Sequence, residues 1–294
     1  MLHKLLGFLS TALVYCLPHH ASARLMRRLA RVRVTAVKNF LIARFVARYR
    51  VDMSSAREPD PLAYPDFNSF FTRALAPGAR PVVAGTDEIA CPVDGTVSQA
   101  GPIDQDRLLQ AKGIEYTLSA LLGGDETLAR SFHGGSFATV YLSPRDYHRI
   151  HMPLAGALAA MRYVPGRLFS VNDYSTRHVR RLFARNERLI TLFDTAAGPM
   201  AVILVGAFFV AGIETVWAGE VSRARPQGSW QRYRHGRSVT VELARGEEMG
   251  RFNMGSTVIV LFGPGRVHWA DILAPGTKVR MGELMGKILV RSEA

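Results

Sequence analysis

The chain has 294 residues, and 48% of them are hydrophobic, which is enough for a substantial core in one large or two modest domains. It has two cysteines, Cys16 and Cys91, and no Cys-x-x-Cys motif, which excludes a disulfide framework and a cysteine-based zinc cluster. The net charge is +13, but the ten basic residues before Asp52 face no acid and leave only +3 for the rest, so we expect the N-terminal segment to meet an anionic membrane or nucleic acid.

Residues 5–17 form the first apolar run, and its 13 positions are too few for a helix to cross about 30 Å of hydrocarbon. The sequence therefore disfavours a spanning helix. Lys4 before the run and Ala21-Ser22-Ala23 after it are also typical of a secretory signal with its cleavage site, and this alternative stays open on the residues alone.

The next segment carries an apolar stripe flanked by arginines. Leu25, Leu29, Val32, Ala36 and Phe40 recur at steps of three and four residues, as in a helix with one apolar face. Such a basic amphipathic helix is typical of a lipid interface, where its arginines reach the phosphates. The alternative is a basic helix packed on its own protein core. The residues alone leave both alternatives open for this basic helical segment, residues 1–55.

The remainder, residues 56–294, is predicted to be a β-rich body. A connector over residues 51–84 encloses the aromatic patch Phe67, Phe70 and Phe71, which we expect to dock on that body. The apolar run 200–217 is interrupted by glycines and predicts two buried strands. Further short β-branched segments predict strands at 95–97, 138–142, 189–193, 239–243 and 256–262. The fold class is therefore α+β, with a barrel-like or sandwich-like body behind N-terminal helices.

The stretch from Ser143 to Pro153 holds two histidines. Ser143, Pro144 and Asp146 have the spacing of a helix N-terminus, and Pro153 would end the helix. On such a helix His148 and His151 would share one face and act on the same small site, as bases or as metal ligands. We do not expect a metal, because the neighbouring sequence supplies no third and fourth ligand.

The second candidate for chemistry is Gly255-Ser256, which precedes a predicted strand. Most Gly-Ser-Thr triplets are turns. A glycine before a serine, however, leaves its carbonyl unshielded and permits backbone conformations closed to other residues. The Ser256 hydroxyl could then attack the Gly255 carbonyl and shift the acyl group from nitrogen to oxygen.

These features occur together in one order along the chain. Asp94-Gly95, the stretch Tyr141 to Pro153 and the segment Gly250 to Thr257 resemble the bacterial phosphatidylserine decarboxylases, and the similarity is colinear over nearly the whole chain. One departure is Met254, where the family usually has leucine. The two side chains have similar volumes, so the substitution is not expected to affect cleavage.

The resemblance implies a self-cleaving enzyme. His151, oriented by Asp94, would act as base on Ser256, and the resulting ester at Gly255 would eliminate to leave a pyruvoyl group at position 256. This group would hold the amine of phosphatidylserine and accept the electrons released with CO2, so no metal or external cofactor is implied. His148 would handle protons during decarboxylation. The residues expected to line the headgroup pocket are Tyr141, Ser170 and Asn172.

The resemblance also implies where the enzyme works. Residues 1–50 would anchor it peripherally on the cytoplasmic side of the cell membrane, with phosphatidylserine as partner and without nucleic acid. Residues 1–255 would become the β chain and residues 256–294 the α chain, in a homodimer. The basic segment 223–237 is interpreted as a solvated loop, with membrane contact as the second interpretation. Two other functions remain open on the residues alone: an ordinary hydrolase triad of Asp94, His151 and Ser256, or a non-catalytic membrane-binding protein.

Overall fold

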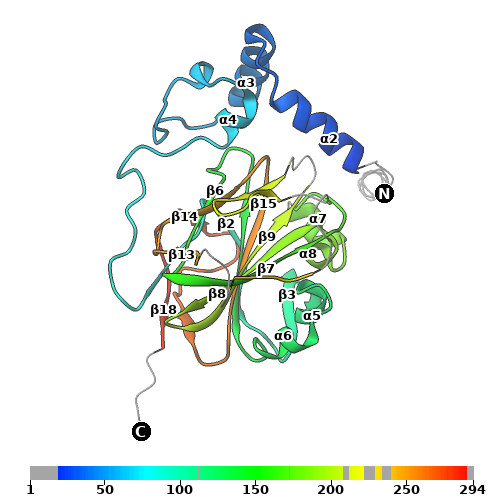
Figure 1. Ribbon diagram of the computed structural model, residues 1–294, viewed down its shortest axis with the longest axis vertical. Coiled ribbons are helices and arrows are strands. Elements are labelled where there is room, and N and C mark those ends of the chain that lie inside the picture. Colours follow the sequence, from blue (N-terminus) through cyan, green and yellow to red (C-terminus); the bar gives the residue numbers. More distant parts are fainter. Residues whose placement is uncertain are drawn as a thin grey trace.

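The structure is a computed structural model that describes residues 19–111, 113–171, 173–207, 212–221, 229–233 and 240–289. The predicted apolar run 5–17 therefore lies outside the described residues, as do Asn172 and most of the basic segment 223–237. Figure 1 shows a group of helices above a body built of strands. In the part of the chain that is described, no helix is both long and apolar enough to span a bilayer.

The N-terminal helices pack together at one end of the body. They are α2 (His19–Ala30), α3 (Thr35–Tyr49), the 3₁₀ turn η1 (Pro61–Ala63) and α4 (Phe67–Phe71). The side chain of Asp66 caps α4 by accepting a hydrogen bond from the Ser69 N–H at 2.8 Å. Helix α2 ends at Ala30 and α3 begins at Thr35, so the apolar stripe predicted from Leu25 to Phe40 is divided between these two helices.

The aromatic patch on α4 packs mainly against α3. The Phe45 ring lies 5.1 Å from the ring of Phe67 and 5.9 Å from that of Phe71, measured between centroids. Phe71 also contacts the body, because its centroid is 4.1 Å from that of His148. The prediction that this patch docks on the body is therefore correct for Phe71, while most of the patch joins the helices to one another.

The body is organised around a large antiparallel sheet. Its strands follow the order β12-β7-β8-β9-β15-β5-β2-β17, and β13 pairs with the edge of β7. Their bounds are β2 (Gly95–Pro102), β5 (Ser136–Leu142), β7 (Gly156–Val164), β8 (Arg188–Thr195), β9 (Gly198–Gly206), β12 (Gln231–Arg232), β13 (Glu242–Leu243), β15 (Ser256–Phe262) and β17 (Lys278–Val279).

Strand β15 is buried on both faces of this sheet, which explains its unbroken apolar sequence. Val258 and Val260 enter the core on one face, and Ile259 and Leu261 enter the core on the other. Smaller antiparallel elements complete the first face. They are β1 (Glu88–Ala90), β18 (Leu284–Ile288) and β16 (Val267–Trp269) in one sheet, and β11 (Gly219–Val221), β10 (Ile213–Thr215), β14 (Glu248–Phe252) and β6 (Arg149–His151) in another.

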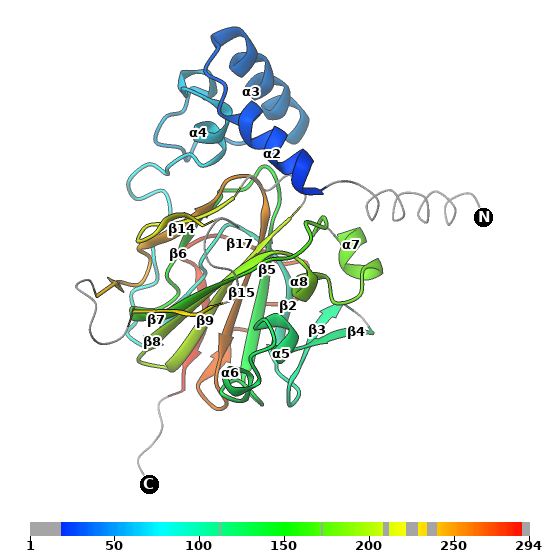
Figure 2. The ribbon, with the colours of Figure 1, turned by 45° about the vertical axis from the view of Figure 1, so that its right-hand side comes forward.

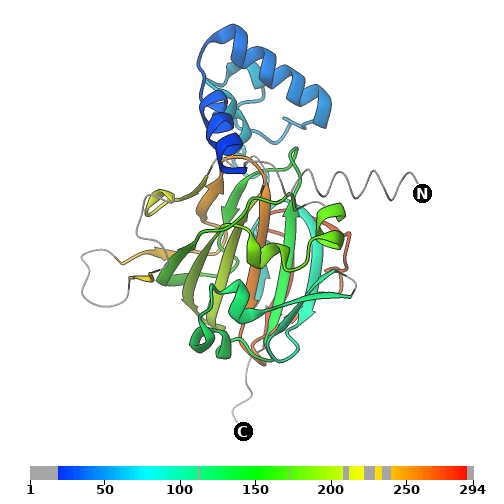
Figure 3. The same ribbon diagram turned by 90° about the vertical axis from the view of Figure 1, so that its right-hand side faces the viewer.

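Short helices and a hairpin cover the other face, and in Figure 3 they lie in front of the large sheet. Leu118, Phe132 and Phe183 fill the core beneath them. These elements are the hairpin β3 (Arg107–Ala111) with β4 (Ile114–Thr117), and the helices α5 (Leu118–Leu121), α6 (Glu126–Arg130), α7 (Asp173–His178) and α8 (Leu182–Arg185). The α+β class with N-terminal helices is therefore confirmed, whereas the division at residue 55 stays a prediction.

The predicted helix from Ser143 to Pro153 is wrong. Asp146 and Ser143 close a turn, because the Ser143 N–H donates to the Asp146 carboxylate at 2.7 Å and the Asp146 N–H donates to the Ser143 carbonyl at 2.9 Å. The chain then enters β6, whose backbone pairs with β14 from His151 opposite Glu248 to Arg149 opposite Arg251. The residues that favoured a helix start therefore form a single turn. The backbone N–H and C=O groups that a helix would use pair with β14 instead.

Candidate active site

The Gly255-Ser256 peptide lies where a strained turn enters the central strand. Met254 has φ = 84° and Gly255 has φ = 46°, and a positive φ is unfavourable for a residue with a side chain such as methionine. Ser256 is the first residue of β15 and pairs with Leu142 of β5 on one side and Gly206 of β9 on the other. The neighbouring strands therefore hold the backbone after this peptide firmly, while the backbone before it is strained.

His148 is fully buried and has one ring nitrogen without a hydrogen bond. Its Nδ1 lies 2.8 Å from the carbonyl oxygen of Asp146, which can only accept, so Nδ1 carries the proton. Its Nε2 has no hydrogen-bond partner among the described residues. Burial lowers the pKa of His148 to about 3, which keeps this nitrogen unprotonated at neutral pH. The His148 carbonyl accepts the Phe252 N–H, which places this residue beside the segment that leads to Ser256.

His151 has both ring nitrogens occupied. Nδ1 lies 2.8 Å from the Gly246 carbonyl and must donate to it, so Nε2 accepts a hydrogen bond from the Tyr147 hydroxyl at 2.9 Å. Burial lowers the pKa of His151, partly opposed by the hydrogen bond to Gly246. This histidine is therefore held as the neutral tautomer that a general base requires, with its basic lone pair directed at Tyr147.

Asp94 is buried beside the start of β2. Its carboxylate accepts hydrogen bonds from Arg80, the shortest at 2.7 Å, and from the Met281 N–H at 2.8 Å. The predicted orientation of His151 by Asp94 is not the arrangement seen here, because Nδ1 of His151 bonds to Gly246 instead. Gly95 is required for close approach, since a Cβ at that position would clash with the Tyr141 carbonyl.

The structure describes two of the three residues predicted to line the headgroup pocket, Tyr141 and Ser170. Tyr141 is half-buried on β5, between Thr96 of β2 and Thr257 of β15. It borders an 830 Å³ cavity that Val171 also lines. Ser170 precedes Val171 and is half-buried, and Asn172 lies outside the described residues. Tyr141 and the segment around Ser170 therefore come together near the first residues of β15.

Two residues that the sequence analysis did not single out belong to this region. Tyr147, four residues before His151, supplies the hydrogen bond to its Nε2. Asn186 is completely buried; its amide N–H groups donate to the carbonyls of Phe169 and Gly206, and its oxygen accepts the Phe169 N–H. Because Gly206 pairs with Ser256, Asn186 connects the segment that leads to Ser170 with the strand beside Ser256. Both lie in segments that resemble the family, Tyr147 within Tyr141 to Pro153 and Asn186 within residues 183–188, and this resemblance was the signal in the sequence.

Known proteins match this chain over most of its length. The family model described as phosphatidylserine decarboxylase matches residues 67–287, and a second model, described as PSD, matches residues 9–50. A phosphatidylserine decarboxylase proenzyme of Bordetella petrii is 56% identical over 271 residues, covering 92% of this chain and 94% of the relative. The corresponding proenzyme of Ectopseudomonas mendocina is 56% identical over 92% of this chain and 95% of its own. That of Pseudomonas putida is 54% identical over 93% of this chain and 95% of its own.

The family model covers most of the chain, and the relatives match it from near one end to the other. The interpretations as an ordinary hydrolase and as a non-catalytic binding protein are therefore wrong. The chain belongs to the phosphatidylserine decarboxylase family and is a proenzyme, which forms phosphatidylethanolamine from phosphatidylserine after it has processed itself.

Proposed function

We propose that self-processing takes place between Gly255 and Ser256 and leaves a β chain of residues 1–255 and an α chain of residues 256–294. The observation that carries the proposal is the pair of positive φ angles at Met254 and Gly255, immediately before a serine whose backbone is fixed in the central strand. At Met254, which unlike Gly255 has a side chain, such a backbone conformation costs on the order of 1–3 kcal/mol, and cleavage after Gly255 relieves it.

In the proposed reaction, His151 takes the proton of the Ser256 hydroxyl, whose oxygen attacks the Gly255 carbonyl carbon. The peptide C–N bond breaks as the ester C–O bond forms. Elimination then releases the Gly255 carboxylate, and hydrolysis of the dehydroalanine that remains gives the pyruvoyl group and ammonia. His151 is already in the tautomer this requires, but its Nε2 must first exchange the Tyr147 hydroxyl for that of Ser256. Asp94 would stabilise the protonated histidine after a local rearrangement that frees its carboxylate from Arg80.

The surroundings fit a pyruvoyl group at position 256. When formed, that group supplies a ketone that binds the substrate amine and accepts electrons as CO2 leaves, so we propose no metal and no external cofactor. The unpartnered Nε2 of His148 supports its role in accepting or returning a proton at the substrate carbon. Tyr141 and Ser170, at the same end of β15, would hold the headgroup, and Asn172 follows them in the chain.

Exposed apolar side chains support membrane association by the N-terminal helices. Leu25 is 59% exposed on α2, while Val34 before α3 and Phe40 within it are 62% and 66% exposed. Arg27 of α2 and Arg31, which follows this helix, form ion pairs with Glu220 of the body at 2.7 and 2.8 Å. We assign these helices to the cytoplasmic face of the cell membrane, where the apolar side chains enter the headgroup boundary and the remaining arginines meet anionic lipid. A homodimer is proposed from the family resemblance alone.

An intact mass spectrum under denaturing, reducing conditions tests the cleavage. The expected result is a large chain and a chain of about 4 kDa, the share that residues 256–294 take of 32.4 kDa, with a ketone in place of its N-terminal amine. Ser256→Ala should stay a single inactive chain of full mass. His148→Ala should be cut normally but fail to release CO2, and a fully active His148→Ala would remove this histidine from the mechanism.

A further inference from the structure

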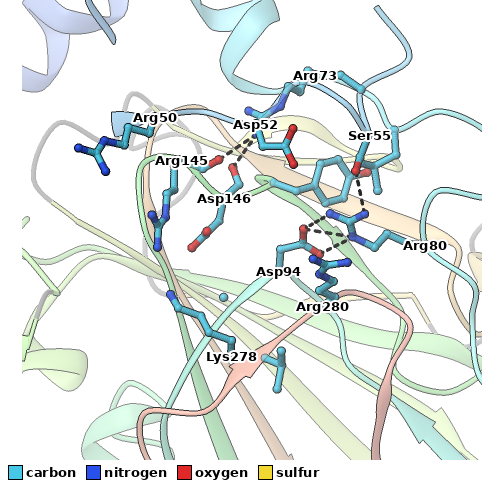
Figure 4. Close-up of a pocket in the computed structure, with 15 residues that line it drawn as sticks. Arg50, Asp52, Ser55, Arg73, Arg80, Asp94, Arg145, Asp146, Lys278 and Arg280 are labelled. Carbon is cyan, nitrogen blue, oxygen red and sulfur yellow. Dashed lines mark hydrogen bonds and ion pairs between the residues drawn. The ribbon is translucent and has the colours of Figure 1, made fainter. Parts of the chain in front are cut away.

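A second cavity, of 380 Å³, lies between the end of α3 and the body. Its wall combines the chain that follows α3, the loop around residue 80, the turn at 145–147 and strand β17, as Figure 4 shows. Five basic side chains surround it, against three acidic ones. The basic residues are Arg73, Arg80, Arg145, Lys278 and Arg280, and the acidic residues are Asp52, Asp94 and Asp146. A sixth basic residue, Arg50, also lines the cavity but points away from the others in Figure 4.

The acidic residues are already engaged. Asp94 is held by Arg80 through contacts as short as 2.7 Å and by a backbone N–H. Asp52 accepts the Ser54 N–H at 2.9 Å, and Asp146 accepts the Ser143 N–H at 2.7 Å. Arg80 is thereby neutralised by Asp94, whereas Arg145 and Arg280 form no ion pair with any described residue. The cavity therefore keeps a positive potential.

Arg73 is the buried basic residue in the wall of this cavity. Its side chain is only 5% exposed and has no carboxylate partner among the described residues. Nη2 donates to the carbonyl of Arg145 at 2.9 Å and lies 3.5 Å from that of Asp146, while Nη1 has no hydrogen-bond partner in the described part of the chain. A buried guanidinium with an unused N–H is costly unless an anion compensates it.

We propose that this cavity binds a phosphate-containing anion. Arginine guanidinium groups recognise phosphate oxygens through paired N–H donors, and the volume accommodates a phosphate with a short polar substituent. Buried Arg73 lies in the wall, and the exposed side chains of Arg145, Lys278 and Arg280 surround the anion. The phosphate comes either from a lipid headgroup at the membrane-facing helices or from free phosphate in solution.

Calorimetric titration of the full-length Ser256→Ala chain tests the site without depending on cleavage or decarboxylation. The probes are inorganic phosphate and dihexanoyl phosphatidylglycerol below its micelle concentration, in acetate buffer. Arg145→Gln/Arg280→Gln should weaken binding at least tenfold. The matched control Arg107→Gln/Lys287→Gln removes the same charge from exposed ion pairs elsewhere and should leave binding unchanged.

The two probes separate the possible sources of the anion. Binding of the short-chain lipid at least tenfold tighter than inorganic phosphate assigns the site to a headgroup, whereas phosphate binding as tightly or more tightly assigns it to the free anion. The proposal is overturned if neither probe binds at about 10 mM, well above the 1 mM that corresponds to about 4 kcal/mol of binding free energy. Equal losses of affinity in the double variant and its charge-matched control would overturn it as well.

Discussion

The Tyr147 hydroxyl donates a hydrogen bond to Nε2 of His151 across 2.9 Å, and in the proposed reaction this is the nitrogen that accepts the serine proton. The opposite nitrogen is fixed by the Gly246 carbonyl, so the histidine has no second lone pair to offer. In the uncut chain His151 is therefore neutral and in the correct tautomer, but its basic nitrogen is hydrogen-bonded to Tyr147. The proposed reaction therefore requires Tyr147 to move before cleavage.

Replacing Tyr147 by phenylalanine should release this base. One hydrogen bond contributes about 1 kcal/mol, so cleavage of Tyr147→Phe is expected to be about fivefold faster. The tyrosine also stabilises neutral His151, and its removal raises the pKa of that histidine. Because the unprotonated form is the active one, the acidic limb of the cleavage-rate profile should move to higher pH. Cleavage of freshly translated chain, followed on gels between pH 5 and 8, measures both effects. Slower cleavage with an unshifted profile would mean that Tyr147 only supports the local structure.

Asn186 should be necessary both for stability and for cleavage. Asn186→Ala takes away three buried hydrogen bonds and is expected to lower the free energy of unfolding by about 3 kcal/mol. Asn186→Asp keeps the acceptor for the Phe169 N–H but loses both donors, including the one to Gly206. Urea titration in a Ser256→Ala background gives the stability, and the rate of cleavage in the wild-type background gives the effect on Ser256. If Asn186→Asp were as stable as the wild type and cleaved at the same rate, the hydrogen bond to Gly206 would have no role in positioning the cleavage strand.

The buried histidines should make the fold sensitive to acid. The pKa of His148 is about 3 in the folded chain against 6.5 for an unperturbed histidine, so between these values the unfolded chain binds a proton that the folded chain does not. His148 therefore removes stability as the pH falls from 6.5 toward 3, by about 1.4 kcal/mol per pH unit. The lowered pKa of His151 acts with the same sign. His148→Gln should have a shallower dependence by urea unfolding at pH 4 to 7, and His133→Gln, at an exposed histidine, serves as the control. Parallel curves for wild type and His148→Gln would mean that folding does not lower the pKa of His148.

The exposed apolar residues of the helices should matter for lipid binding and not for folding. Leu25→Ser/Phe40→Ser is expected to reduce sedimentation with vesicles containing phosphatidylserine at least tenfold, because burial of each side chain contributes about 1.5–3 kcal/mol. Thermal unfolding without lipid should be unchanged. Ile272→Ser, which alters a 60% exposed side chain in the loop before β17, controls for general loss of surface hydrophobicity. Equal vesicle binding by the double variant and the wild type would assign the membrane contact to another surface.

The sequence predicted best those elements whose surroundings are uniform. The segment 256–262 is apolar at every position after its first two residues because both faces of β15 are buried, and such a run predicts a central strand without further information. The segment 143–153 was predicted wrongly because its local signals favour a helix start. What decides its conformation is β14, about a hundred residues further along the chain.

The candidate site was predictable in its residue types and not in its contacts. His148, His151 and Ser256 were identified as a group, and the fold brings the turn before β6 and the start of β15 to the same region. The partner of each group depends on tertiary structure: Asp94 meets Arg80, and His151 meets Gly246 and Tyr147. Local sequence does not predict such pairings, because the backbone carbonyl of Gly246 has the same chemistry as every other backbone carbonyl in the chain.

Because β15 lies between β5 and β9, folding of the chain must precede its cleavage. With a cut at Gly255-Ser256, the shorter product contributes the middle strand of the large sheet, and its apolar side chains reach both cores. Synthesised alone, that product would be an insoluble peptide, and its partner would be a sheet with a central gap. The two subunits therefore have to arise within an already folded chain, and once unfolded they are not expected to find each other again.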